Sequence, residues 1–150
     1  MKKLILLILF VQVTSCVTET GNERHYHYEI VNNSGVNIEI IPYKNPDNSQ
    51  ADVSKKISIL NGKSYSKEVS VSPPYADNLD FQRMLYEGYL TKVCFTFNNS
   101  KKILYEYCPN GICLNDRNIF NYTFNNETTE IYTITPEDYQ NAIDCGGNCN

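Results

Sequence analysis

Short segments in which apolar and polar residues alternate recur along most of the chain. Alternation with a period of two residues predicts strands that bury one face, and turn residues such as Asn, Gly and Pro separate the segments. The eight predicted strands cover residues 26–32, 36–43, 56–60, 64–71, 91–97, 103–107, 119–124 and 130–135. Many short strands with regular turn signals predict an all-β fold, and we expect an antiparallel β-sandwich.

The two-residue period also predicts which side chains form the core between the two layers. In the hairpin of 91–107 we expect Phe97 to lie opposite Ile103. The predicted inward rows are Tyr26, Tyr28 and Ile30; Val36, Ile38 and Ile40; Val93, Phe95 and Phe97; Ile103, Tyr105 and Tyr107; Phe120, Tyr122 and Phe124; and Tyr132 and Ile134.

Two segments lack the strand pattern and predict short helices. In the segment 72–90, two consecutive prolines exclude a regular strand, and Asn78 could cap a short helix over 78–87. Near the end of the chain, Thr135 is a capping residue, and Pro136 suits the first helical position. Acidic residues follow, so we expect a C-terminal helix that runs to about Ile143.

The charge balance limits the classes of partner. Thirteen Lys and Arg face seventeen Asp and Glu, for a formal net charge of −4. Nucleic-acid-binding domains usually carry a basic excess on one face, so we expect no nucleic-acid partner. A length of 150 residues suits one domain.

The first fifteen residues have the features of a signal peptide. Lys2 and Lys3 precede an unbroken apolar run over 4–11, which is much shorter than a membrane-spanning helix requires. The sequence Val13-Thr14-Ser15-Cys16 then resembles the lipobox of bacterial lipoproteins. The alternative is an ordinary signal peptide with a chance cysteine beside its cleavage site.

The lipoprotein resemblance implies a diacylglycerol on the sulfur of Cys16 and removal of residues 1–15. Residues 16–24 would then be a polar tether, and 25–150 the folded domain. The protein would be held at a membrane of the bacterial cell envelope by its lipid, with the outer membrane as the favoured one. The body resembles, at the level of architecture alone, the immunoglobulin-like sandwiches of many exported lipoproteins.

Export would place the remaining five cysteines where disulfides form. Their spacing favours two local bridges, Cys108–Cys113 and Cys145–Cys149, and leaves Cys94 unpaired inside a strand. Two alternatives are a Cys94–Cys108 bridge and a zinc site. The spacings are not the tight knuckles of zinc sites, so we expect no metal.

The chain lacks the common catalytic motifs, and we expect no enzyme and no cofactor. His25 and His27 could share a metal with Glu29, but a solvent-facing row of a strand is the simpler interpretation. Asp77 and Asp80 could form a glycosidase pair, although two acids in a loop are more often solvated or capping.

The segment 72–90 is the predicted contact region. It carries Tyr75, Tyr86 and Tyr89, and aromatic residues on loops of a rigid sandwich suit recognition. The alternative is that these rings close the end of the core. We therefore expect a non-enzymatic binding or structural module of the envelope. Two other hypotheses are a glycan-binding accessory of an uptake system and an envelope inhibitor of a foreign enzyme.

Overall fold

A computed structural model describes residues 21–44, 50–75, 79–87, 90–108 and 111–149. Its strands are β1 (Arg24–Asn32), β2 (Ile38–Lys44), β3 (Gln50–Ala51), β4 (Ile57–Ile59), β5 (Ser64–Val71), β6 (Lys92–Phe97), β7 (Lys101–Glu106), β8 (Thr129–Ile134) and β9 (Ile143–Asp144). Its helical elements are the 3₁₀ turns η1 (Val53–Lys55) and η3 (Tyr122–Phe124) and the short helices α2 (Phe81–Leu85) and α3 (Pro136–Asn141).

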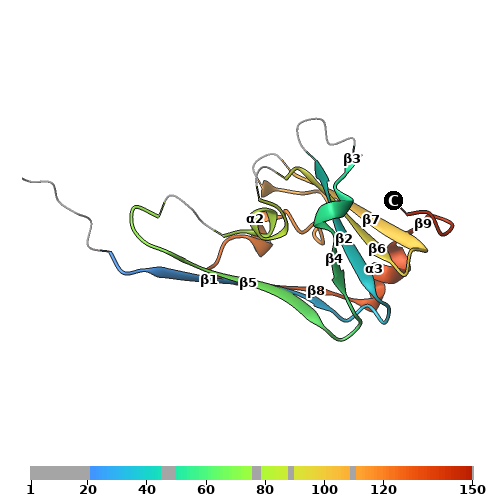
Figure 1. Cartoon of the computed structure of the whole chain (residues 1–150), viewed down its shortest axis with the longest axis horizontal. Coiled ribbons are helices and arrows are strands. Elements are labelled where there is room, and N and C mark those ends of the chain that lie inside the picture. The colour runs from blue at the N-terminus through green and yellow to red at the C-terminus, as the bar shows by residue number, and fades with distance from the viewer. Residues whose placement is uncertain (1–20, 45–49, 76–78, 88–89, 109–110, 150) are drawn as a thin grey trace, which may run out of the picture.

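The strands form two sheets, which confirms the expected all-β, sandwich-like fold. One sheet has the order β5-β1-β8, and the other has the order β3-β2-β6-β7-β9, with β4 also paired to β2. Figure 1 shows the long β1–β5 ribbon running along the molecule, with the larger sheet gathered toward one end of it. Side chains from both sheets meet in one core. There the ring centroids of Phe95 on β6 and Tyr132 on β8 lie 6.2 Å apart.

One strand pair departs from the wholly antiparallel arrangement that we expected. β8 runs parallel to β1, with Ile30 opposite Tyr132, while β5 pairs with the other edge of β1 in antiparallel fashion. A parallel pair requires a long connection between its strands. The chain supplies one, because it completes β2 to β7 before β8 returns to the first sheet.

The prediction of a strand over 119–124 is wrong. This segment forms turns and η3, because the side chains of Asn118, Asn121 and Asn125 hydrogen-bond to backbone groups close by in the sequence. Asparagine offers the backbone such local alternatives to strand pairing. As a consequence, Tyr122 does not face the core: 61% of it is exposed.

The predicted inward rows of the other strands are largely confirmed, with a correction in the β6–β7 hairpin. Phe97 pairs with Lys101, and Phe95 pairs with Ile103. Asn98 and Asn99 both adopt positive φ, which makes the turn tight enough for pairing to begin at Lys101. Tyr107 lies beyond the end of β7 and is 40% exposed, so its predicted place in the core is also wrong.

Both predicted helices are present, with shifted ends. The C-terminal helix α3 starts as expected, with a capping box between Thr135 and Asp138, but it ends at Asn141 because the following residues pair with β7 as β9. Asp80, rather than Asn78, caps α2 by accepting a hydrogen bond from the Arg83 backbone. Asn78 lies outside the described residues.

The two local disulfides favoured by the spacing, Cys108–Cys113 and Cys145–Cys149, are both present. Cys94 is a free, buried thiol on β6, and burial raises its pKa. Within the described part of the chain, no helix is long and apolar enough to cross a membrane. Cys16 and the predicted signal peptide precede the first described residue.

Candidate functional site

The structure separates the tyrosines that we expected to form one contact region. The hydroxyl of Tyr75 donates to the backbone carbonyl of Asn22 at 2.6 Å, and its ring lies 3.9 Å from the guanidinium of Arg24. Tyr86 packs against the core and donates to Asp52 at 3.4 Å. These two rings therefore hold different parts of the fold, and Tyr89 lies outside the described residues.

A different set of aromatic and polar side chains meets in an open groove of about 250 Å³. It joins the start of α2, which belongs to the predicted contact segment, to the segment around the first disulfide. We call it the Tyr122 groove. Its lining residues are Asp80, Gln82, Tyr107, Gly111, Phe120, Tyr122 and Asn125.

The α2 wall of the groove is fixed by its attachment to the core. The ring of Phe81 is fully buried and contacts the ring of Tyr28 edge-on, with 5.0 Å between the centroids. The backbone N–H of Phe81 donates to Asn125 Oδ1 at 2.9 Å, which ties α2 to the opposite wall. Asp80 and Gln82, on either side of Phe81, line the groove as a result.

The opposite wall is held by the disulfide loop and by the asparagine-stabilised turns. The Cys108–Cys113 bridge closes the loop that carries Gly111. Gly111 has a φ of +67°, and an added Cβ would lie only 3.3 Å from Tyr122 Cβ, so Gly111 packs closely against the base of Tyr122. The rings of Tyr107 and Phe120 contact each other edge-on at 6.2 Å.

The groove combines exposed aromatic surface with polar atoms that make no hydrogen bond within the described part of the fold. Among the described residues, the Tyr122 hydroxyl and the Gln82 Oε1 have no hydrogen-bond partner, whereas Gln82 Nε2 donates to the carbonyl of Leu90. Asp80 adds a carboxylate, and the described lining includes no Lys, Arg or His. The groove can therefore accept and donate hydrogen bonds beside an aromatic ring, and its charge disfavours anions.

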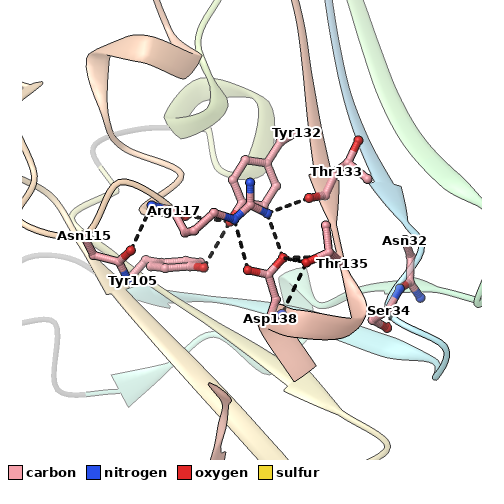
Figure 2. Close-up of polar contacts among 9 residues, drawn as sticks. All are labelled: Asn32, Ser34, Tyr105, Asn115, Arg117, Tyr132, Thr133, Thr135 and Asp138. Atoms are coloured by element: carbon pink, nitrogen blue, oxygen red, sulfur yellow. Dashed lines mark hydrogen bonds and ion pairs between the residues drawn. The ribbon is translucent and has the colours of Figure 1, made fainter. Parts of the chain in front are cut away.

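A second polar group, the Arg117–Asp138 cluster, lies where α3 meets β8 (Figure 2). Arg117 Nε and Nη2 donate to the two oxygens of Asp138 at 3.0 and 2.7 Å, and Nη2 also donates to the carbonyl of Thr133 at 2.6 Å. The backbone N–H of Thr135 donates to Asp138 Oδ2 at 2.8 Å. This arrangement links α3, β8 and the segment before η3.

Two buried tyrosines complete the cluster. The Tyr132 hydroxyl donates to the backbone carbonyl of Arg117 at 2.6 Å and lies 3.0 Å from the Tyr105 hydroxyl on β7. Burial raises the pKa of both hydroxyls, so both tyrosines stay neutral in the ordinary pH range. Every polar group named in the cluster has a partner, which is the arrangement of a structural connection rather than of a binding site.

The charges in the cluster stabilise each other. Burial alone would raise the pKa of Asp138, but the Arg117 guanidinium and the groups of Thr135 outweigh it, and the pKa is lowered. The hydrogen bond to Asp138 in turn raises the pKa of Arg117. Asp138 therefore carries its negative charge to a lower pH than an ordinary carboxyl group.

The two histidines lie on the same face of β1, as their spacing predicts. His25 Nδ1 lies 2.7 Å from the hydroxyl of Ser70, and His27 Nδ1 lies 3.0 Å from a carboxylate oxygen of Glu68 on β5. No group of three His, Cys, Asp or Glu in the described ranges could hold a metal ion. The buried Tyr26 and Tyr28 alternate with them on the opposite face.

The Tyr122 groove and the Arg117–Asp138 cluster were both missed by the sequence reasoning. The alternation over 119–124 placed Tyr122 in the core, and the asparagines that break the strand were the signal against it. Arg117 stands between Asp116 and Asn118 with nothing nearby to indicate its partner 21 residues further on.

The fold and the groove define a class: an all-β, sandwich-like domain with an open aromatic groove at the junction of α2 and η3. A scan against protein-family models, a search of curated proteins and a search of solved structures each find no match to this chain.

Proposed function

We propose that this chain is a lipid-anchored, non-enzymatic binding module of the bacterial cell envelope, and that the Tyr122 groove is its binding site. The single observation that carries the binding role is the exposure of Tyr122 in a groove that Tyr107 also lines and whose walls are tied to the fold by the Phe81–Asn125 hydrogen bond and the Cys108–Cys113 disulfide. With 61% of the residue exposed, Tyr122 offers aromatic surface that a partner can bury, and tyrosine is enriched among the residues that contribute most to binding.

The anchoring part of the proposal rests on the sequence of the first sixteen residues. An apolar run followed by Val13-Thr14-Ser15-Cys16 fits acylation of Cys16 and cleavage before it. Intact mass spectrometry of protein extracted from membranes tests this part. A chain that begins at Cys16 with added acyl mass is the expected result, and a chain cut elsewhere with an unmodified Cys16 would overturn it.

The binding part can be tested without knowing the ligand. Tyrosine nitration of the full chain is measured by mass spectrometry in intact envelopes and after extraction into detergent. We expect Tyr122 to react several-fold more slowly in the envelope, because a bound ligand covers its ring. Tyr75 is the matched control, since its hydroxyl is already engaged by Asn22 in the fold and should react alike in both states. Equal reactivity of Tyr122 in both states would contradict the proposal.

A further inference from the structure

We infer that the ligand class of the Tyr122 groove is a neutral carbohydrate, an inference that rests on the proposed binding role of this groove. The groove places the exposed Tyr122 beside amide and carboxylate side chains. Sugar rings present an apolar C–H face and a rim of hydroxyls, and each hydroxyl can both donate and accept a hydrogen bond. An exposed aromatic face next to planar polar side chains matches both properties.

The polar groups of the groove match the hydroxyl rim. Gln82 Oε1 can accept from a sugar hydroxyl, and the unpartnered hydroxyl of Tyr122 can donate or accept. The carboxylate of Asp80 is fixed in direction because its Oδ1 accepts from the Arg83 backbone at 2.7 Å. A fixed carboxylate forms strong, charge-assisted bonds with hydroxyl donors.

The charge of the groove decides between neutral and acidic sugars. The described lining contains one carboxylate and no basic side chain, and the whole chain has a formal charge of −4. A phosphate or a uronic acid would meet Asp80, and none of the described lining residues supplies a positive charge to offset the repulsion. A neutral ring meets no such penalty.

The size and the openness of the groove point to the end or side of a chain of sugars. Its volume of about 250 Å³ lies just below the usual range of small-molecule sites, about 300–1,000 Å³. That space suits a terminal or branching ring whose neighbours extend into solvent. Most of Tyr122 is exposed, so its ring is accessible to a sugar that enters the open groove.

The test screens the detergent-extracted full chain against an array of immobilised neutral oligosaccharides built from glucose, mannose, galactose and N-acetylglucosamine. The binding affinity of the best oligosaccharide is then measured by titration calorimetry for four variants. Tyr122→Ala should weaken binding about tenfold or more, because it removes the stacking surface. Tyr122→Phe should retain most of the affinity, and Tyr75→Ala, outside the groove, should retain all of it.

Asp80→Asn separates a sugar from a cationic ligand. Asparagine is also a good helix cap, so α2 should keep its start while the groove loses its charge. For a neutral sugar the affinity should fall by only a few-fold. If tetramethylammonium binds instead, and Asp80→Asn abolishes that binding, the groove is an aromatic cation site and the carbohydrate inference is wrong.

Negative results in the array and in the nitration experiment overturn different parts of the proposal. If no neutral oligosaccharide binds while Tyr122 remains protected in envelopes, the carbohydrate inference is overturned and the binding role stands. If Tyr122 is also unprotected in envelopes, both are overturned. Binding that Tyr122→Ala leaves unchanged would place the sugar elsewhere and would also overturn the inference.

Discussion

The Arg117–Asp138 cluster and the Tyr122 groove use the same kinds of side chain to opposite effect. In the cluster, the hydroxyl of Tyr132 and the carboxylate of Asp138 are buried, and each is bonded to other parts of the fold. In the groove, Tyr122 is mostly exposed, and its hydroxyl has no partner among the described residues. Residue type therefore does not separate the structural cluster from the proposed binding site, and the difference lies in whether the hydrogen-bonding groups are already used within the fold.

Substitutions in the two sites should change different properties of the protein. Changes in the cluster should lower the free energy of unfolding, because they leave buried polar groups without partners. Changes at Tyr122, the exposed ring of the groove, should affect ligand affinity and leave stability almost unchanged. Phe81 contacts both sites: its ring contacts Tyr28 and Tyr132, and its backbone N–H donates to Asn125 in the groove wall.

Phe81→Ala should have the largest effect and should lower both the stability of the fold and the affinity of the groove. Its ring is fully buried, so its removal should cost about 3–5 kcal/mol in the free energy of unfolding measured with denaturant. It should also loosen α2 and with it the groove, so oligosaccharide affinity should fall too. The control is Glu87→Ala, an exposed position just after α2. A loss below about 1 kcal/mol would show that α2 is not anchored through this ring.

Asp138→Asn should have the next largest effect, confined to stability. Asparagine keeps the shape and can still accept from Thr135, but it leaves Arg117 without its counter-charge. Removing one partner of a buried pair costs about 3–5 kcal/mol, and the 39% exposure of the Arg117 side chain reduces this to about 2–4 kcal/mol. Glu137→Gln, the exposed neighbour on α3, should cost less than about 1 kcal/mol. Equal losses in the two variants would contradict the role of the cluster.

The same variant gives a pH-dependent prediction. The pKa of Asp138 is lower in the folded protein than in the unfolded chain, so its contribution to stability is fully present above the ordinary carboxyl pKa of about 3.9. The contribution is lost as the pH falls through the lower, folded-state value. The stability difference between the parent protein and Asp138→Asn should therefore be constant near neutral pH and should narrow below about pH 4. A difference that grows on acidification would have the wrong sign.

The strand pattern of the sequence was a good guide where one face of a strand is buried. Ser64–Val71 matches its predicted bounds, and the inward rows of β1 and β6 are buried as expected. The pattern failed over 119–124, where local hydrogen bonds from asparagine side chains replace strand pairing. It also could not indicate that β8 pairs in parallel with β1, because alternation carries no information about strand direction.

The candidate site was predicted only in part. The segment 72–90 does contribute to the groove through Asp80 and Gln82, but Tyr75 and Tyr86 are not among its described lining residues, and Tyr89 lies outside the described residues. Tyr107 and Tyr122 were both assigned to the core, because a period of two gives aromatic residues an inward place whenever a strand is assumed. The groove depends on long-range contacts, such as that between Phe81 and Asn125, that a single sequence does not reveal.

The smallest expected effects come from a matched pair of substitutions that sharpens the comparison between the two sites. Tyr132→Phe removes a hydroxyl that donates to the Arg117 carbonyl and contacts the Tyr105 hydroxyl, so it should cost about 1–2 kcal/mol in the free energy of unfolding. Tyr122→Phe removes a hydroxyl with no partner among the described residues, and its effect on stability should stay within about 0.5 kcal/mol. Denaturant unfolding of both variants under the same conditions measures the difference. Because the two substitutions delete the same atom from the same residue type, a similar cost in both would mean that Tyr122 is held by the fold rather than free for a ligand.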